Sequence, residues 1–240
     1  GVQVVGIKYI GDNQSVGFFQ NANTLVGIDE GIILSSGRVI DGLGPNGGAG
    51  TGIGTSGVND VDLTSISGIG TDDVAGYIID FIPSTDSLEF QYVFASDEYN
   101  DFVCNINDAF GFFISGPGIT GTFSNNSKNI ALVSGTNTPV SINTINNGNG
   151  TPNCPPTNSQ YFIDNDFNYT GASPYNIEYD GFTKILTAKV VVIPCQQYRM
   201  KIVVGDASDD VWDSAVFLAA RSFSATDLTV EVNTGNIDNI

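Results

Sequence analysis

The chain of 240 residues carries 8 basic and 26 acidic side chains, which gives a formal net charge of −18 at pH 7. A surface this acidic repels nucleic acid and anionic membranes, so we exclude both as partners. The chain contains no histidine, which excludes Ser-His-Asp triads, Cys-His pairs and histidine-based metal centres. It also has no apolar run long enough to span a bilayer, so we expect no direct membrane insertion.

Most of the chain has the pattern of short β-strands. Apolar residues recur mainly at a spacing of two, and glycine or proline interrupts the sequence too often for helices of three turns. We therefore predict strands and no helix. In chain order, the predicted strands are 2–10, 31–40, 76–82, 88–96, 109–115, 129–133, 140–144, 177–179, 186–193, 198–204, 215–223 and 228–232.

The connections between these strands indicate the fold class. The segment between the first two strands is polar, and 42–57 and 146–159 are rich in glycine and asparagine, which is typical of long loops. Strands 76–82 and 88–96 flank a short turn, so they should form an antiparallel hairpin or a corner. Many short alternating strands with turn signals predict an all-β, antiparallel β-sandwich, jelly-roll-like, with long Gly/Asn-rich loops.

The first acidic loop lies between the aromatic strands 88–96 and 109–115. Anionic groups crowded into so short a loop repel one another unless a cation or dense hydrogen bonding offsets the charge. The loop offers side-chain oxygens from Asp97, Glu98, Asn100, Asp101, Asn107 and Asp108.

A second acidic loop, 206–213, has the sequence DASDDVWD and again lies between two predicted strands. Its first residues have the alternate spacing of an EF-hand loop. However, Trp212 stands in the region of the turn glycine and Phe217 stands where the bidentate glutamate is required, so the loop is not an EF-hand. The carboxylates that we consider as ligands are Asp206, Asp209 and Asp213.

The two acidic loops together predict a calcium site. Hard oxygen ligands without histidine or cysteine favour Ca²⁺ over zinc or copper, and Ca²⁺ accepts irregular ligand sets from loops. We expect both loops to meet at one end of the sandwich and to hold one or more Ca²⁺ ions. The nine expected metal ligands are Asp97, Glu98, Asn100, Asp101, Asn107, Asp108, Asp206, Asp209 and Asp213.

Other roles for acidic residues remain open. The loops could form a hydrogen-bonded acidic network without an ion. Glu98 and Asp213 could instead pair with basic residues of the strands, namely Arg199, Lys201 or Arg221. Further candidate ligands are Asp60, Asp62, Asp72 and Asp73, although turns and solvated loop positions are the favoured explanation for them.

The three cysteines, Cys104, Cys154 and Cys195, fit neither a CxxC redox motif nor a zinc knuckle. The acidic, lysine-poor composition indicates an extracellular protein, in which one disulfide could form. All three pairings are open, as are three isolated thiols. We favour Cys104–Cys154, because both residues lie in long polar loops while Cys195 closes an apolar strand.

Several motifs are similar to a known family. FASDEYNDFVCNINDAFGFFISGPG resembles the signature of the choice-of-anchor L domain, and GIILSSG, NIALVSGTNTPVSINTIN, YDGFTKILTAKVVVIPC and YRMKIVVGDASDDVWDSAVFLAARSF extend the resemblance. It covers nearly the whole chain and continues on both sides of 42–57. We therefore interpret residues 1–240 as a single domain. The resemblance implies a bacterial module, secreted or at the cell surface.

We weigh three functions. The favoured one is a non-catalytic extracellular module for adhesion, recognition or fibre structure, rigidified by calcium. Its partners would be other cell-surface or matrix components or further copies of itself. The alternative is a calcium-dependent, lectin-like domain that binds glycans, with Trp212 or a loop tyrosine stacking on a sugar ring. A hydrolase with Glu98 and Asp213 as paired carboxylates is disfavoured, because these residues lie in loops, so we expect no enzyme.

Overall fold

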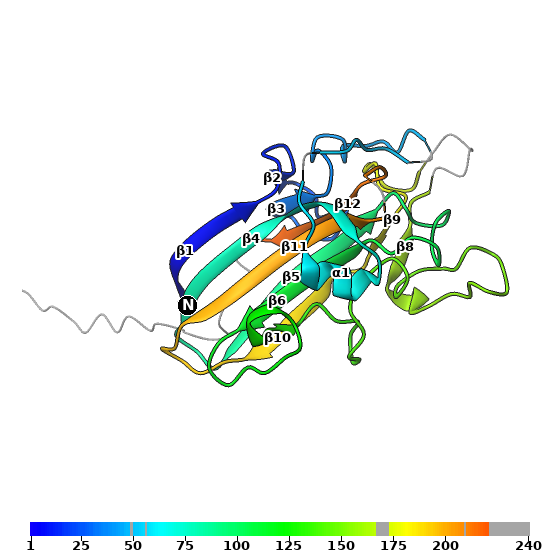
Figure 1. Cartoon of the computed structure of the whole chain (residues 1–240). Coiled ribbons are helices and arrows are strands. Elements are labelled where there is room, and N and C mark those ends of the chain that lie inside the picture. Colours follow the sequence, from blue (N-terminus) through cyan, green and yellow to red (C-terminus); the bar gives the residue numbers. More distant parts are fainter. Residues whose placement is uncertain (49, 56, 167–172, 209, 221–240) are drawn as a thin grey trace, which may run out of the picture.

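The structure is a computed structural model that describes residues 1–48, 50–55, 57–166, 173–208 and 210–220. Two antiparallel sheets lie face to face (Figure 1). The prediction of an all-β sandwich is confirmed.

The first sheet has five strands in the order β1-β4-β11-β6-β7, so β1 and β7 are its edges. Every pairing in it is antiparallel. Its strands are β1 (Val2–Ile10), β4 (Thr71–Pro83), β6 (Ala109–Ser115), β7 (Lys128–Asn129) and β11 (Tyr198–Ala207).

The second sheet has seven strands in the order β2-β3-β12-β5-β9-β8, with β10 paired to β5 beside this path. Its strands are β2 (Val16–Gln20), β3 (Glu30–Ser35), β5 (Ser87–Ser96), β8 (Phe162–Asp164), β9 (Gly181–Thr183), β10 (Leu186–Val191) and β12 (Ser214–Ala219). Because β4 and β5 belong to different sheets, the turn between them is a corner rather than a hairpin.

Strand β5 carries the centre of the core. Its alternate residues Leu88, Phe90, Tyr92 and Phe94 are buried between the sheets, as the period of two predicts. The rings of Phe90 and Phe112 lie 5.2 Å apart, which ties β5 to the opposite sheet. Burying each such side chain contributes about 1.5–3 kcal/mol to the stability of the fold.

Several predicted strand boundaries were wrong. Strand β2 was expected to be part of a polar segment, but it forms the edge of the second sheet. The prediction missed it because an edge strand leaves Phe18 exposed and so lacks a clean alternation. Segments 140–144 and 177–179 form isolated bridges only, and β3 ends at Ser35. Segment 228–232 lies outside the described residues.

The prediction of no helix was also wrong. Helix α1 (Val61–Ser67) is short, and the side chain of Asp60 caps it by accepting hydrogen bonds from the amides of Asp62 and Leu63. Gly68 follows at φ 78°, a left-handed conformation that ends helices. Two 3₁₀ turns, η1 (Ser124–Asn126) and η2 (Ser159–Tyr161), lie in later loops.

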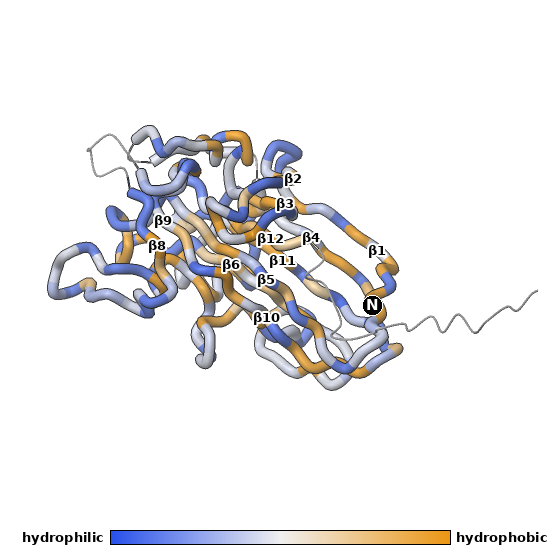
Figure 2. The backbone as a smooth tube through the Cα atoms, turned by 180° about the vertical axis from the view of Figure 1, so that it is seen from behind, coloured by the Kyte–Doolittle hydropathy of each residue, from blue (hydrophilic) through white to orange (hydrophobic). Residues whose placement is uncertain are grey.

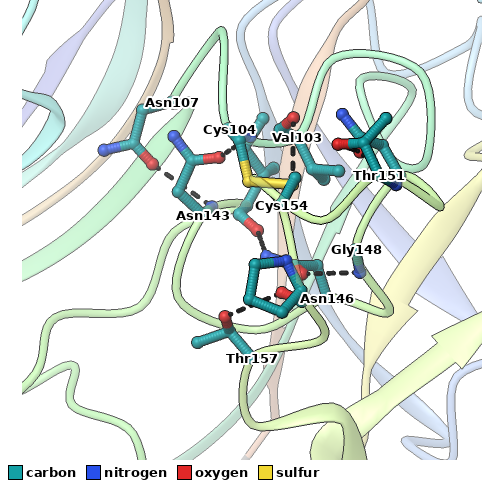
Figure 3. The surroundings of a disulfide bond; sticks show 12 residues. Val103, Cys104, Asn107, Asn143, Asn146, Gly148, Thr151, Cys154 and Thr157 are labelled. Atoms are coloured by element: carbon teal, nitrogen blue, oxygen red, sulfur yellow. Dashed lines mark hydrogen bonds between the residues drawn. A yellow bond between two sulfur atoms is a disulfide. The ribbon is translucent and has the colours of Figure 1, made fainter.

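A disulfide joins two of the long loops. Cys104 and Cys154 are bonded, with their Cα atoms 5.9 Å apart, which confirms the favoured pairing (Figure 3). The side chain of Asn143 accepts a hydrogen bond from the amide of Cys104, so polar contacts surround the disulfide. Cys195 is an exposed free thiol.

Candidate metal centre

The two acidic loops meet at one end of the sandwich. Each connects a strand of one sheet to a strand of the other, from β5 to β6 and from β11 to β12. The amide of Asp97 donates to the carbonyl of Asp213 at 3.1 Å. The carboxylate of Asp108 accepts from the hydroxyl of Ser214 at 2.8 Å and from the amide of Ala207 at 2.9 Å. The loops therefore lie side by side, as the sequence led us to expect.

Buried carboxylates gather where these loops meet. They come from strands and loops of both sheets, and the exposed fraction of each residue is 8 % or less. Charge repulsion links them, because several raise the pKa values of others. We call this group the carboxylate cluster; its members are Asp73, Asp97, Asp108, Glu178, Asp180, Asp206 and Asp213.

Among the members of the cluster, Asp206 has the carboxylate whose negative charge is least offset by hydrogen bonds. The register between β11 and β4 shifts between Val204 and Asp206, and such a bulge re-aims the side chains beside it. Asp206 is only 1 % exposed, and neither of its carboxylate oxygens accepts a hydrogen bond of normal geometry. The nearby hydroxyl of Ser36 offsets part of its charge. Oδ1 of Asp213 is also buried without a hydrogen-bond partner.

Burial makes the charged forms of these residues unfavourable. It raises the pKa of Asp206 well above its usual value, and the neighbouring Asp108 raises it further. The pKa of Asp97 is raised by burial and by the charge of Asp180. Burial also raises the pKa of Asp213 to about 8 and that of Asp180 to about 7. At neutral pH, the cluster therefore favours bound protons or a bound cation.

The glycine-rich segment 42–57 lies over the carboxylate cluster, and we call this segment the cover. Its backbone and side chains donate hydrogen bonds to four of the carboxylates, so it is attached at several points. The donors are Asn46 to Asp180 at 2.6 Å, Thr51 to Asp97 at 3.3 Å and to Glu178 at 2.5 Å, and Thr55 and Gly57 to Asp73 at 2.6 and 2.9 Å.

Two glycines let this segment approach closely. A Cβ atom on Gly52 would lie 2.4 Å from a carboxylate oxygen of Asp213, and the φ of Gly52 is +152°. A Cβ atom on Gly50, at φ +93°, would overlap the indole of Trp212. A side chain at either position would push segment 42–57 away from the second acidic loop, which explains the glycine at these two positions.

Trp212 of the second acidic loop lies against Gly50 of segment 42–57 and is partly exposed. Its ring centroid is 4.1 Å from that of Phe102, so the two acidic loops also contact each other through aromatic rings. Trp212 has a φ of 67°, which places its indole over Gly50. Its position immediately before Asp213 puts an aromatic surface beside the carboxylates.

The expected ligands divide into two groups. Asp97, Asp108, Asp206 and Asp213 belong to the carboxylate cluster, and Glu98 is buried as well. The others have different surroundings: Asp101 is exposed, Asn100 donates to Asp164 and Asp166, Asn107 donates to the carbonyl of Ser67, and Asp209 lies outside the described residues.

The sequence left open that Glu98 and Asp213 form ion pairs with Arg199, Lys201 or Arg221. This alternative is wrong for the first two of these basic residues. Arg199 forms a bidentate ion pair with Asp80, and Lys201 binds Asp60 and Asp62. The third candidate, Arg221, lies outside the described residues.

The sequence analysis missed Glu178 and Asp180. They flank Tyr179 just before β9, and the side chain of Asp180 faces Asn46 across 134 positions of sequence. The alternation IEYDG was a weak signal that both carboxylates share one face of an extended segment. Within the described part of the chain, no three acidic or cysteine side chains are already arranged as a metal-binding group.

A family model for the choice-of-anchor L domain matches residues 1–224. The chain belongs to the choice-of-anchor L domain family. Comparison with curated proteins and with solved structures gives no significant match. Choice-of-anchor L membership indicates a bacterial module that is secreted or at the cell surface, rather than a catalytic domain. None of the described helices has the length and apolar character needed to cross a membrane.

Proposed function

We propose that this choice-of-anchor L domain is a non-catalytic surface module whose carboxylate cluster binds Ca²⁺. The ion would fix the acidic loops and their glycine-rich cover as a rigid surface. That surface would serve contact with other cell-surface or matrix components, in adhesion or in fibre structure. The observation that supports this most directly is Asp206, whose carboxylate is buried with no hydrogen bond of normal geometry and no basic partner among the described residues.

The donor set favours calcium among biological cations. All the available ligands are oxygens, and Asp206 and Asp213 each have at least one buried oxygen free to bind. Ca²⁺ accepts six to eight oxygen ligands in irregular geometry, whereas Mg²⁺ demands a regular octahedron. A cation would draw these carboxylates and Asp108 together and remove the repulsion that raises their pKa values.

Calcium would affect the surface through the cover. Thr51 donates to Asp97 and Glu178, and its carbonyl accepts from the amide of Asp213 at 3.2 Å. An ion that holds Asp213 therefore also holds the glycine-rich segment and Trp212. Ordering loops before a partner arrives lowers the entropy cost of binding, which suits a recognition module.

Thermal unfolding tests calcium binding directly. Calcium at about 100 times its dissociation constant should stabilise the fold by about 2.7 kcal/mol relative to protein in EGTA. Equal magnesium should have a much smaller effect. Asp80→Asn, which alters an ion pair in the first sheet, should retain the calcium effect. Identical melting temperatures in calcium and EGTA would contradict the proposal.

Terbium luminescence locates the ion. Tb³⁺ replaces Ca²⁺ in oxygen sites, and Trp212 is the chain's single tryptophan, so excitation of its indole should sensitise bound Tb³⁺. We expect strong emission that excess Ca²⁺ abolishes, and its loss in Asp206→Asn. Emission that is unchanged in Asp206→Asn would place the ion elsewhere.

One observation supports the lectin-like alternative. Trp212 presents a partly exposed indole beside the carboxylates, and calcium-dependent sugar sites combine such a ring with acidic ligands. A glycan array probed in calcium and in EGTA distinguishes the two functions. Calcium-dependent hits that Trp212→Ala removes would favour sugar binding, and an array without hits would favour a contact module.

A further inference from the structure

The end of the sandwich at which the acidic loops meet is strongly polar. Each acidic loop carries four acidic side chains, and neither the loops nor the cover contains a lysine or an arginine. Figure 2 shows mainly hydrophilic segments at this end, near β8 and β9, whereas the apolar stretches of β1 lie on the opposite side of the molecule. A group of exposed apolar side chains at this end therefore needs an explanation.

Four apolar residues form such a group. Ile53 of the cover is 46 % exposed, and Val211 of the second acidic loop is 43 % exposed. Trp212 is partly exposed, and its ring centroid lies 4.1 Å from that of Phe102, a partly exposed residue of the first acidic loop. We call these four residues the tip patch. They come from the same three segments that meet at the carboxylate cluster.

The cover places Ile53 beside the other members of the tip patch. A Cβ atom added to Gly52 would lie 2.4 Å from an oxygen of Asp213, and one added to Gly54 would lie 2.5 Å from an oxygen of Asp210. Ile53 stands between these two glycines, so this part of the cover runs alongside the second acidic loop. The tip patch is therefore one contiguous surface.

Exposed carboxylates flank the tip patch. Asp101 precedes Phe102 and Asp210 precedes Val211, and both acidic residues are exposed. An acidic partner would be repelled by them and by the net charge of −18. A second copy of this chain fits less well for the same reason. Charge complementarity thus favours a partner that presents basic side chains beside an apolar one.

The tip patch also favours a polypeptide over a sugar. Sugar rings stack on aromatic faces, but their hydroxyl groups need hydrogen-bonding partners around the ring. The side chains of Ile53 and Val211 offer only aliphatic surface next to Trp212. An apolar side chain of a peptide loses no hydrogen bond on such a surface, and tryptophan is enriched among the residues that dominate protein contacts.

We propose that the tip patch binds a segment of a partner protein in which one apolar side chain is flanked by lysine or arginine. The apolar side chain packs against Trp212, and its basic neighbours pair with Asp101 and Asp210. This inference rests on the proposed function, because it names the partner class of the contact surface that calcium would hold in place. Binding should therefore be weaker in EGTA, where calcium no longer fixes the cover and Ile53.

Three labelled peptides test this proposal with the full chain. Their sequences are GKKFKKG, GKKSKKG and GEEFEEG, so they differ only in the central side chain or in the flanking charges. In calcium, fluorescence anisotropy should show that GKKFKKG binds about tenfold more tightly than GKKSKKG, because it buries an aromatic side chain. GEEFEEG should not bind, and added salt should weaken the binding of GKKFKKG.

A matched pair of variants locates the binding surface. Val211→Ser removes an apolar side chain from the tip patch. Val191→Ser makes the same change in β10, where Val191 is 73 % exposed and lies opposite Ser87, at the end of β5 remote from Asp97. The preference for GKKFKKG over GKKSKKG should fall several-fold in Val211→Ser and remain in Val191→Ser. Ile53→Ser, at a second exposed position of the patch, should repeat the loss if Val211→Ser does not fold.

Four results would overturn the proposal. Equal binding of GKKFKKG and GKKSKKG to the wild-type protein would show that charge alone explains the contact. Equal preferences in Val211→Ser and Val191→Ser would place the contact elsewhere. Glycan-array hits that Trp212→Ala removes, without a preference for GKKFKKG, would assign the patch to sugars. Dimers in light scattering that Val211→Ser dissolves would assign it to a second copy.

Melting temperatures of the same samples separate this inference from calcium binding. Stabilisation by calcium without a peptide preference would overturn the partner class alone. A peptide preference that is equal in calcium and in EGTA, in a protein that calcium does not stabilise, would support the partner class and contradict the role of calcium.

Discussion

Two groups of carboxylates in this protein, each with buried members, differ in whether a lysine binds them among the described residues. Asp60 and Asp62 surround the ammonium of Lys201, with nitrogen-to-oxygen distances of 2.6 and 2.7 Å. Asp206 and Asp213 of the carboxylate cluster form no ion pair with a lysine or arginine of the described residues. Arg38 offsets a small part of the charge of Asp213 but is itself bound to Asp41.

The difference appears in the pKa values. Burial acts on the pKa of Asp62 in the upward direction, but hydrogen bonds from Lys201 and Ser124 outweigh it, so the pKa falls below its usual value. In the cluster, burial and like charges act together, and the pKa of Asp213 rises to about 8. Burial alone therefore does not decide the ionisation of an aspartate here. A nearby cation also does, and Asp206 and Asp213 form no ion pair with one among the described residues.

The largest expected effect comes from removing the cation of the first group. Lys201→Met would leave the partly buried Asp60 and the buried Asp62 without their cation, so it should lower the free energy of unfolding by about 3 kcal/mol. Urea unfolding measures the change. Lys189→Met is the control, because Lys189 pairs with Glu89 at the surface and is 60 % exposed. It should cost less than about 1 kcal/mol. An equal loss of unfolding free energy in both variants would show that Lys201 does not offset the charges of Asp60 and Asp62 more than a surface lysine offsets that of its partner.

The opposite change in the cluster should have the opposite sign. In EGTA at about pH 8, Asp206→Asn removes an uncompensated buried charge and should raise the free energy of unfolding by about 1–3 kcal/mol. Calcium should no longer stabilise the variant. The exposed Asp101→Asn is the control and should behave as wild type in both conditions. A destabilised Asp206→Asn protein in EGTA would show that the charge is already compensated.

The stability of the metal-free protein should depend on pH. A carboxylate with a raised folded-state pKa stabilises the fold fully below its unfolded-state pKa, and this stability is lost as pH rises through the folded-state value. With pKa values of about 7 for Asp180 and about 8 for Asp213, the loss falls between about pH 4 and pH 8.

We therefore expect the melting temperature in EGTA to fall by on the order of 5 °C between about pH 5 and pH 8.5. Calcium should flatten this dependence, because the bound ion holds the carboxylates in their charged forms. Differential scanning calorimetry at matched ionic strength measures both curves. A melting temperature in EGTA that rises over this range would contradict the raised pKa values.

The smallest expected effect concerns the cover of the cluster. Gly52→Ala places a Cβ atom against Asp213 at a φ that alanine rarely adopts, so it should cost about 1 kcal/mol and weaken calcium binding. Gly48→Ala in the same segment meets no atom within 4 Å and should behave as wild type. Calorimetric titration with calcium compares the two. Equal affinities would show that the cover does not touch the ion site.

Local patterns in the sequence predicted much of the architecture. The alternation of Leu88, Phe90, Tyr92 and Phe94 correctly identified β5 and its buried face, because side-chain direction in a strand depends on the backbone alone. The Cys104–Cys154 pairing was favoured for a similar local reason, the length and polarity of the two loops.

Elements that depend on distant partners were missed. Helix α1 has a capping residue at Asp60, but seven residues do not form a stable helix alone, and Leu63 is buried only because the first sheet lies beneath it. Strand β2 is similar, since pairing with β3 rather than its own pattern makes it extended.

The sequence by itself determined that this is a sandwich of short strands with two acidic loops and no histidine ligand for a metal, because composition and period are properties of the chain. Only the tertiary structure decided which carboxylates lie together. Asp62 binds Lys201 across 139 positions, while Asp206 lies near Asp108 and pairs with no lysine or arginine in the part of the chain that the structure describes. Burial and charge separation depend on how remote segments pack, and no local pattern records them.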